Sequence, residues 1–157
     1  MKNRSAGIDV GGTFAKIGLV SPDGTVLEAI QIPTLPEKGP ADFVRRAEGV
    51  LRNWSFSSIG LGLAGGVDSR TGTLQFVPNL KGWTGFSFKR AFERAYAVPV
   101  AVDNDANVAV WGGYAVALKK RPRHVVGLTL GTGVGGGLIV DGRLHVGATG
   151  SAGSSAT

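Results

Sequence analysis

Apolar and polar positions along the chain fall into short segments that predict alternating strands and helices. The first apolar run reaches Asp9 and the next runs from Ile17 to Val20, with glycines between the two and a Ser-Pro-Asp-Gly turn after them. This order predicts a strand, a tight turn and a returning strand. Residues 26–32 alternate loosely between apolar and polar and predict a third strand of the same antiparallel meander.

Three later segments have the spacing of amphipathic helices. They cover residues 41–54, residues 88–96 after the N-cap candidate Ser87, and the stretch from the polar run at 103–107 to about Leu118. The residues expected to face the core are Phe43, Ala47, Val50, Leu51 and Trp54 in the first helix, Ala91, Phe92 and Ala95 in the second, and Val108, Trp111, Ala115 and Leu118 in the third.

Short strands are predicted between these helices, at residues 59–63, 74–77 and 100–102. The first of them runs into Gly65 and Gly66, as is typical of a strand at the rim of a ligand cleft. Strands that alternate with helices after an opening meander indicate an α/β domain with a mixed sheet.

The opening pattern returns near the C-terminus. GIDVGGTFAKIGLV at 7–20 and VVGLTLGTGVGGGLIVDG at 125–142 each place a glycine–threonine turn between two apolar runs. Two such turns facing one another would hold a polyphosphate from both sides, whereas a chance repeat of two glycine-rich hairpins is the alternative. We predict an N-terminal domain at 1–122 and the start of a second, truncated domain of the same kind at 123–157, with about half of a two-domain protein missing.

Composition narrows the class of protein. The 157 residues are 43% hydrophobic and 18% charged, which indicates a globular domain. No apolar run approaches membrane-spanning length and the N-terminus lacks a secretory apolar segment, so we expect a cytoplasmic protein with no membrane partner. With Cys 0 there is no disulfide and no cysteine-based zinc site in this chain. The net charge of +6 is scattered and no nucleic-acid-binding motif is present, so no nucleic-acid partner is expected.

Candidate chemistry begins at the first glycine turn. Gly11 and Gly12 let the backbone approach a ligand closely, and successive N–H groups in such a turn form a concavity suited to an anion. Thr13 adds a hydroxyl, and the Asp9 carboxylate at the mouth of the loop could hold a phosphate-bound Mg²⁺. A plain β-hairpin in which Asp9 caps its own turn is the alternative.

A second polar cluster lies where a strand ends and a helix begins, at Asp103, Asn104, Asp105 and Asn107. Ligands collect at this edge of α/β sheets. A carboxylate there can accept the proton of a substrate hydroxyl as the hydroxyl attacks a γ-phosphate, and an amide side chain suits a polyol because it both donates and accepts hydrogen bonds. The alternative is that Asp103 or Asp105 simply caps the helix.

Five motifs carry a family resemblance: DVGGT at 9–13, GLGLAGGVD at 60–68, PNLKGW at 78–83, NDAN at 104–107 and LGTGVGGG at 130–137. In their order and spacing the chain resembles the N-terminal half of the ROK family of sugar kinases and repressors. The resemblance implies the actin-like ATPase (ribonuclease H-like) fold, with ATP and Mg²⁺ as cofactors and a hexose as the small-molecule partner.

The resemblance also implies roles for individual residues. Asp105 would be the catalytic base and Asn104 a sugar ligand, whereas Lys16 fits a phosphate contact and a surface position equally. The first phosphate loop would comprise Asp9, Gly11, Gly12 and Thr13, the second Gly131, Thr132 and Gly133, and the sugar pocket Gly65, Gly66 and Asn79.

The chain also departs from the family pattern. Gly113 stands where the family usually has Glu, and Ser154 follows GSAG where a sugar-binding Glu-x-Gly-His would continue. The family's zinc motif and its adenine-binding part would lie beyond Thr157.

The expected activity is ATP-dependent phosphorylation of a hexose, of the glucokinase type. The motifs are shared by kinases of glucose, fructose, N-acetylmannosamine and N-acetylglucosamine, and they fit a polyphosphate donor as well as ATP. A truncated, non-catalytic fragment is one alternative. A sugar-responsive ROK regulator is another, although the few residues before the first phosphate loop leave no room for a DNA-binding head. A homo-oligomer is compatible with each of these readings.

Overall fold

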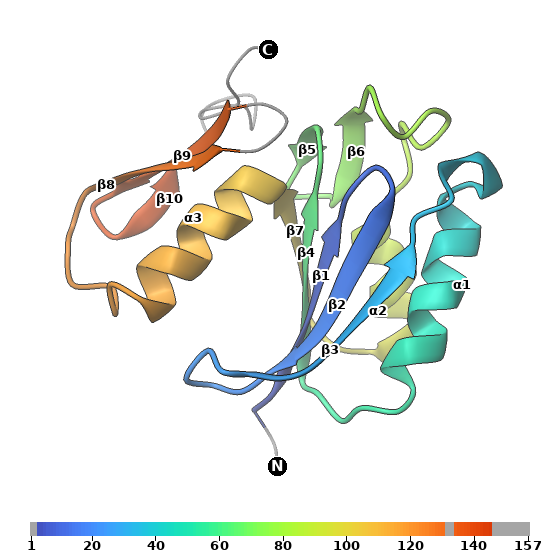
Figure 1. Cartoon of the computed structure of the whole chain (residues 1–157), viewed down its shortest axis with the longest axis horizontal. Helices are drawn as coiled ribbons and strands as arrows, with labels where there is room; N and C mark the ends of the chain where they lie inside the picture. Colours follow the sequence, from blue (N-terminus) through green and yellow to red (C-terminus); the bar gives the residue numbers. More distant parts are fainter. Residues whose placement is uncertain (1–2, 131–133, 146–157) are drawn as a thin grey trace.

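The computed structural model of the chain describes residues 3–130 and 134–145. Its centre is a five-stranded mixed sheet in the order β3-β2-β1-β4-β7 (Figure 1). The strands β1 (Ser5–Val10), β2 (Phe14–Val20) and β3 (Val26–Pro33) form the predicted antiparallel meander. The strands β4 (Ser58–Leu63) and β7 (Val100–Asn104) continue the sheet parallel to β1. The predicted α/β class with a mixed sheet is confirmed.

Helices lie on both faces of this sheet. The helices α1 (Pro40–Leu51) and α2 (Phe88–Tyr96) cover one face, and α3 (Asp105–Val116) lies against β4 and β7 on the other (Figure 1). A short 3-10 turn, Pro36–Lys38, precedes α1, and the two-stranded hairpin of β5 (Gly66–Asp68) and β6 (Thr73–Phe76) extends from the end of β4. None of the helices in the described ranges is long and apolar enough to cross a membrane.

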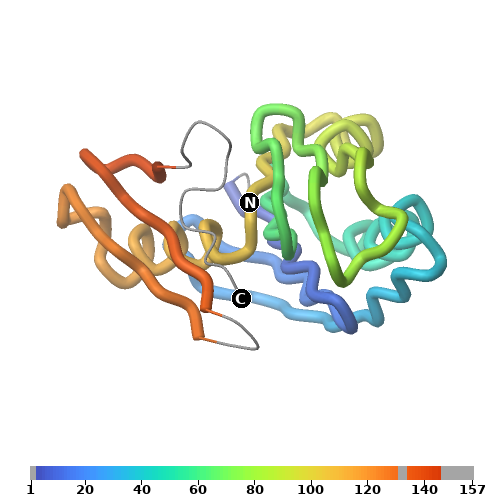
Figure 2. The backbone as a smooth tube through the Cα atoms, turned by 90° about the horizontal axis from the view of Figure 1, so that it is seen from above, coloured from blue at the N-terminus to red at the C-terminus, as the bar shows by residue number. Residues whose placement is uncertain are grey.

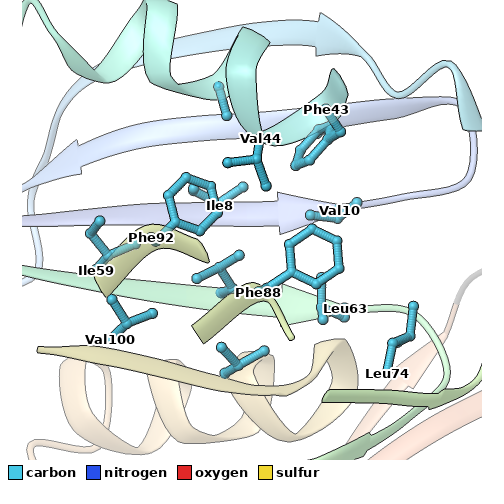
Figure 3. Close-up of a cluster of buried hydrophobic side chains, with 14 of the residues drawn as sticks. Ile8, Val10, Phe43, Val44, Ile59, Leu63, Leu74, Phe88, Phe92 and Val100 are labelled. Atoms are coloured by element: carbon cyan, nitrogen blue, oxygen red, sulfur yellow. The ribbon is translucent and has the colours of Figure 1, made fainter. Parts of the chain in front are cut away.

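Alternate residues of the central strands form the core under α1 and α2. Side chains of a strand point in turn to its two faces, and Ile8 and Val10 of β1 are almost completely buried on the side of these helices. Figure 3 shows Phe43 of α1 and Phe88 of α2 packed over this layer. The side chain of Asp9, which lies between Ile8 and Val10 in β1, therefore points to the opposite face of the sheet.

Two predicted helix faces need small corrections. Helix α1 ends at Leu51 rather than near residue 54, and the Trp54 indole N–H beyond it donates to Glu28 Oε2 at 2.8 Å. In α2 the N-cap Ser87 is confirmed, because its Oγ accepts from the Arg90 N–H. Ala95, however, is exposed, and the second buried residue beside Phe92 is Phe88 in the first turn.

The predicted inward face of α3 is wrong for two of its four residues, while Trp111 packs against the buried cluster of this helix and Ala115 is half-buried. Val108 and Leu118 are 39% and 41% exposed, whereas Val110 and Tyr114 are buried. The helix is apolar on nearly all sides, so periodicity could not select its buried face. The buried face is instead the one that packs closely on glycines of the second sheet. A Cβ on Gly127, for example, would lie 2.4 Å from Val110 Cγ2.

The repeated pattern forms a second, separate sheet. The strands β8 (Val125–Leu130), β9 (Val134–Val140) and β10 (Arg143–His145) lie in the order β10-β9-β8 and pack against the outer side of α3. Figure 2 shows this sheet at one end of the molecule and α1 at the other. The predicted second strand–turn–strand is thus present in its two strands, while its turn at 131–133 lies outside the described residues. The division at 122 and 123 stays a prediction.

Candidate functional site

The candidate site lies at the edge where the parallel strands β1, β4 and β7 end. From β1 the chain turns through residues 11–13 into β2, from β4 it enters Gly65 and Gly66, and from β7 it passes at Asn104 directly into α3. The carboxyl ends of parallel strands are the usual ligand edge of an α/β sheet. The topology therefore brings predicted residues from distant parts of the sequence to one edge.

One register row joins the polar residues of this edge across the sheet. Asp9 of β1 pairs with Lys16 of β2 on one side and with Gly62 of β4 on the other, and Gly62 pairs in turn with Asp103 of β7. Paired residues project to the same face of a sheet. Lys16 is exposed beside Asp9 on that face, so the register is compatible with both of its predicted roles.

Gly62 is a residue that sequence reasoning missed. A Cβ at this position would lie 3.4 Å from the Cα of Asp105 and 3.6 Å from the Cβ of Val108. The absence of a side chain at Gly62 lets the first turn of α3 approach the sheet, and this approach brings Asp105 toward Asp9. The only sequence signal was a glycine inside an otherwise apolar strand, which can indicate a close approach of another backbone.

The carboxyl group of Asp105 has a pKa raised above its ordinary value. Partial removal from water is the main cause, and the negative charge of Asp9 raises the pKa further, while hydrogen bonds to backbone N–H groups, chiefly that of Ala106, act in the opposite direction. The N–H of Ala106 donates to Asp105 Oδ1 at 2.8 Å. A carboxylate with a raised pKa is a stronger base, so the shift at Asp105 is in the direction that favours proton acceptance.

Asn104, rather than either neighbouring aspartate, is the N-cap of α3. Its Oδ1 accepts from the N–H of Ala106 at 3.0 Å and from that of Asn107 at 3.4 Å, and its Nδ2 donates to the carbonyl oxygen of Gly65 at 2.9 Å. Asp103 is engaged separately, because its Oδ1 accepts from the Asn107 side chain at 2.9 Å. The N-cap is therefore Asn104 and not the aspartates of the capping alternative, although Asp105 shares the N–H of Ala106 in the first turn. Asn104 also links α3 to the glycines that follow β4.

The predicted sugar-pocket residues lie around these contacts. Gly65 has a φ of +108°, and a Cβ there would lie 2.2 Å from the carbonyl oxygen of Phe76, so the position requires glycine. Gly66 pairs with Phe76 in the β5–β6 hairpin. Asn79 is exposed in the following loop, and its Cβ lies 3.4 Å from where a Cβ on Gly12 would be. The predicted sugar and phosphate residues thus adjoin one another.

The first predicted phosphate loop is a tight connection between β1 and β2. The N–H of Gly11 donates to the carbonyl oxygen of Phe14 at 3.1 Å, and a Cβ on Gly11 would lie 2.9 Å from that oxygen. The exposed Thr13 ends the loop. This connection is also a hairpin turn between antiparallel strands, as the β-hairpin alternative proposed. Asp9, which precedes the turn, lies close enough to Asp105 for its charge to raise the pKa of that residue.

Two further predicted features are limited by what the structure describes. Gly131, Thr132 and Gly133 of the second phosphate loop lie outside the described residues. Within residues 3–130 and 134–145, no three His, Cys, Asp or Glu side chains come together as a metal site. Mg²⁺ commonly takes only one or two protein carboxylates and completes its shell with water and phosphate oxygens. The role of Asp9 as a Mg²⁺ ligand stays a prediction.

The sequence model of the ROK family matches residues 5–155. This chain belongs to the ROK family. The glucokinase of Streptomyces coelicolor is 36% identical over 143 residues, which are 90% of this chain and 45% of that protein. The glucokinase of Thermotoga maritima is 35% identical over 153 residues, 95% of this chain and 48% of that protein.

A solved structure supports the fold. The ROK family glucokinase of Streptomyces griseus, in complex with glucose and AMPPNP, superposes with a TM-score of 0.83 at 35% identity. The alignment covers 96% of this chain and 49% of that one. The predicted actin-like ATPase fold is confirmed by these relationships. The chain spans about half the length of the curated relatives it matches.

Proposed function

We propose that the protein to which this chain belongs transfers a phosphoryl group from ATP to a hydroxyl of a hexose, as a glucokinase-type enzyme. The observation that carries this proposal is Asp105, a carboxylate with a raised pKa, held at the sheet edge where the Gly11–Thr13 loop and the Asn79 loop adjoin. The named relatives support it, since they are glucokinases and one was solved with glucose and a nucleotide.

Each group at the edge has a task in this proposal. Asp105 orients the attacking hydroxyl and accepts its proton. Asn104, with Gly65, Gly66 and Asn79, binds the sugar, using the amide hydrogen that is not directed to Gly65. The backbone of Gly11 and Gly12 and the hydroxyl of Thr13 hold phosphate, together with a second loop at 131–133.

A magnesium ion fits the donor set at this edge, with Asp9 as its carboxylate ligand. Bound there, Mg²⁺ would neutralise negative charge on the phosphates of ATP. Because the reaction draws on ATP, we also propose a cytoplasmic location for the protein, with the hexose as its partner molecule.

A second candidate follows from length. Since the chain spans about half of its curated relatives, it can act as one half of a site that binds sugar without turnover. The two candidates differ in a measurable way: the first requires hexose-dependent release of ADP, and the second requires binding of hexose without such release.

The test is ADP release by the 157-residue chain with Mg-ATP and a panel of hexoses, beside an Asp105→Asn variant. We expect turnover with at least one hexose and a loss of about 10²–10⁴-fold in the variant, which is the usual contribution of a general base. Hexose binding by the variant, measured by calorimetry, should persist. An Asp105→Asn variant that turns over at the wild-type rate contradicts the role of Asp105 as catalytic base. A folded chain that binds hexose but releases no ADP favours the half-site candidate.

A further inference from the structure

Thr34 is a buried polar residue that the proposed reaction does not use. It follows β3 directly and is 0% exposed. Its hydroxyl donates to the carbonyl oxygen of Gly11 at 2.7 Å, and its backbone N–H donates to the carbonyl oxygen of Thr13 at 2.8 Å. One residue therefore holds the predicted phosphate loop on both sides of Gly12.

These two hydrogen bonds determine which way the loop peptides face. In a trans peptide the C=O and the following N–H point in opposite directions, and the described chain has no cis peptide bond. Because the carbonyl of Gly11 points at the buried hydroxyl of Thr34, the N–H of Gly12 points away from Thr34 and from the core. An outward N–H at the tip of a glycine turn is the group that binds an anion.

Thr34 is itself held from α1. The guanidinium of Arg46 donates through Nη2 to the carbonyl oxygen of Thr34 at 2.7 Å and through Nη1 to the carbonyl oxygen of Pro33, and its Nε donates to Asp42 Oδ2 at 2.7 Å. Arg45 also pairs with Asp42, at 2.5 Å, but its side chain is 71% exposed. Arg46 thus joins the helix to the segment that carries Thr34, whereas Arg45 is a natural control.

The same segment is also tied to the loop that carries Asn79. The indole N–H of the buried Trp83 donates to the carbonyl oxygen of Pro36 at 2.9 Å. The segment after β3 is therefore fixed from the helix on one side and from the predicted sugar loop on the other. Such double anchoring keeps the Thr34 hydroxyl at a constant position beneath the phosphate loop.

We propose that Thr34 is a positioning residue for nucleotide phosphate: it turns the Gly12 amide toward the phosphate, and Arg46 holds Thr34 in place. The phosphate part of this inference rests on the proposed function. The loop part rests on the hydrogen bonds alone, so the two can be tested separately.

The experiment compares Thr34→Val, which removes the hydroxyl at similar volume, with Thr34→Ser, which keeps it. Amide hydrogen exchange of the Gly11–Thr13 loop is followed by NMR, and the affinities for Mg-AMPPNP and for glucose are measured by titration of the same samples. We expect Thr34→Val to speed exchange in the loop and to weaken Mg-AMPPNP binding by about tenfold, because a buried carbonyl loses its donor. Thr34→Ser should resemble the wild type, and glucose affinity should be unchanged in both.

The arginine pair supplies the matched control. Arg46→Lys should reproduce part of the Thr34→Val effect, because lysine lacks the fork that reaches two carbonyls, whereas Arg45→Lys should have none. Thr34→Ser as damaging as Thr34→Val would mean that packing alone matters and would overturn the inference, as would unchanged exchange and affinity in Thr34→Val. A wild-type chain that binds no Mg-AMPPNP would favour the half-site candidate and would overturn the phosphate part of the inference for this chain. The exchange rates would still decide whether Thr34 holds the loop.

Discussion

Hydrogen bonding distinguishes the two aspartates that flank Asn104. Asp103 accepts from the side chain of Asn107 and from the backbone N–H of Asn104, so its carboxylate is engaged in holding the segment together. Asp105 is the first residue of α3, accepts only a backbone hydrogen bond, from Ala106, among the described contacts, and has its pKa raised in part by the charge of Asp9. The raised pKa therefore falls on the residue with the better position to accept a proton from a ligand at the sheet edge.

The raised pKa of Asp105 predicts a pH-dependent cost to stability. A carboxyl whose folded pKa exceeds its unfolded value favours folding when protonated, and that advantage is lost as the pH rises through the folded pKa. Asp105→Asn, which cannot ionise, should therefore unfold at an equal or slightly higher Tm than the wild type at pH 7. The difference should fade as the pH falls toward the ordinary carboxyl value of 3.8. Thermal unfolding followed by circular dichroism at several pH values measures this, and a lower Tm of the variant at pH 7 would contradict it.

The sequence predicted the site residues that belong to contiguous motifs, and it missed the residues that only the fold brings to the site. Asp9 and Asp105 lie in recognisable segments, and the structure brings them close enough for one charge to influence the other. Gly62 and Thr34 lie far from those segments in sequence. The sheet register puts Gly62 beside Asp9, and the end of β3 puts Thr34 beneath the loop.

At the scale of elements, the junction of β7 and α3 combines a helix cap with a link between strands. Asn104 uses its acceptor for the first turn of α3 and its donor for the carbonyl of Gly65. Sequence periodicity predicted the position of this helix but not its buried face. That face is determined by the glycines of β8 and β9, which leave room for Val110 to pack against the second sheet. The cap, by contrast, is a local property of the helix start.

Substitution of Asn104 separates the two roles. Asn104→Ala removes the cap and the link, and loss of an N-cap typically costs about 1 kcal/mol in the free energy of unfolding; a further loss is expected from the unpaired Gly65 carbonyl. Asn104→Asp keeps the acceptor and should retain most of the cap contribution. Urea unfolding of the wild type and the two variants measures their free energies of unfolding, which should decrease in the order wild type, Asn104→Asp, Asn104→Ala. Equal stability of the Ala and Asp variants would mean that the cap contributes nothing.

At the scale of the whole molecule, the sheet of β8, β9 and β10 has one covered face and one open face. Its inner face packs on α3, while Val126, Leu128 and Leu130 on β8 are 74%, 71% and 83% exposed. β8 is also one of the two edge strands of this sheet among the described residues. Contiguous exposed apolar side chains on an edge strand are an association surface.

This surface predicts concentration-dependent self-association of the 157-residue chain. Two chains that meet through β8 would bury apolar area and pair an open edge, whereas charged side chains at the same positions would repel each other. The paired substitution Val126→Lys and Leu128→Lys should therefore shift the chain toward the monomer. As a control, Val26→Lys should leave the association unchanged, because this valine is 60% exposed but lies on β3, an edge strand of the five-stranded sheet. Sedimentation velocity over a range of concentrations measures both, and a wild-type chain that stays monomeric throughout would show that the open face of β8 does not mediate association.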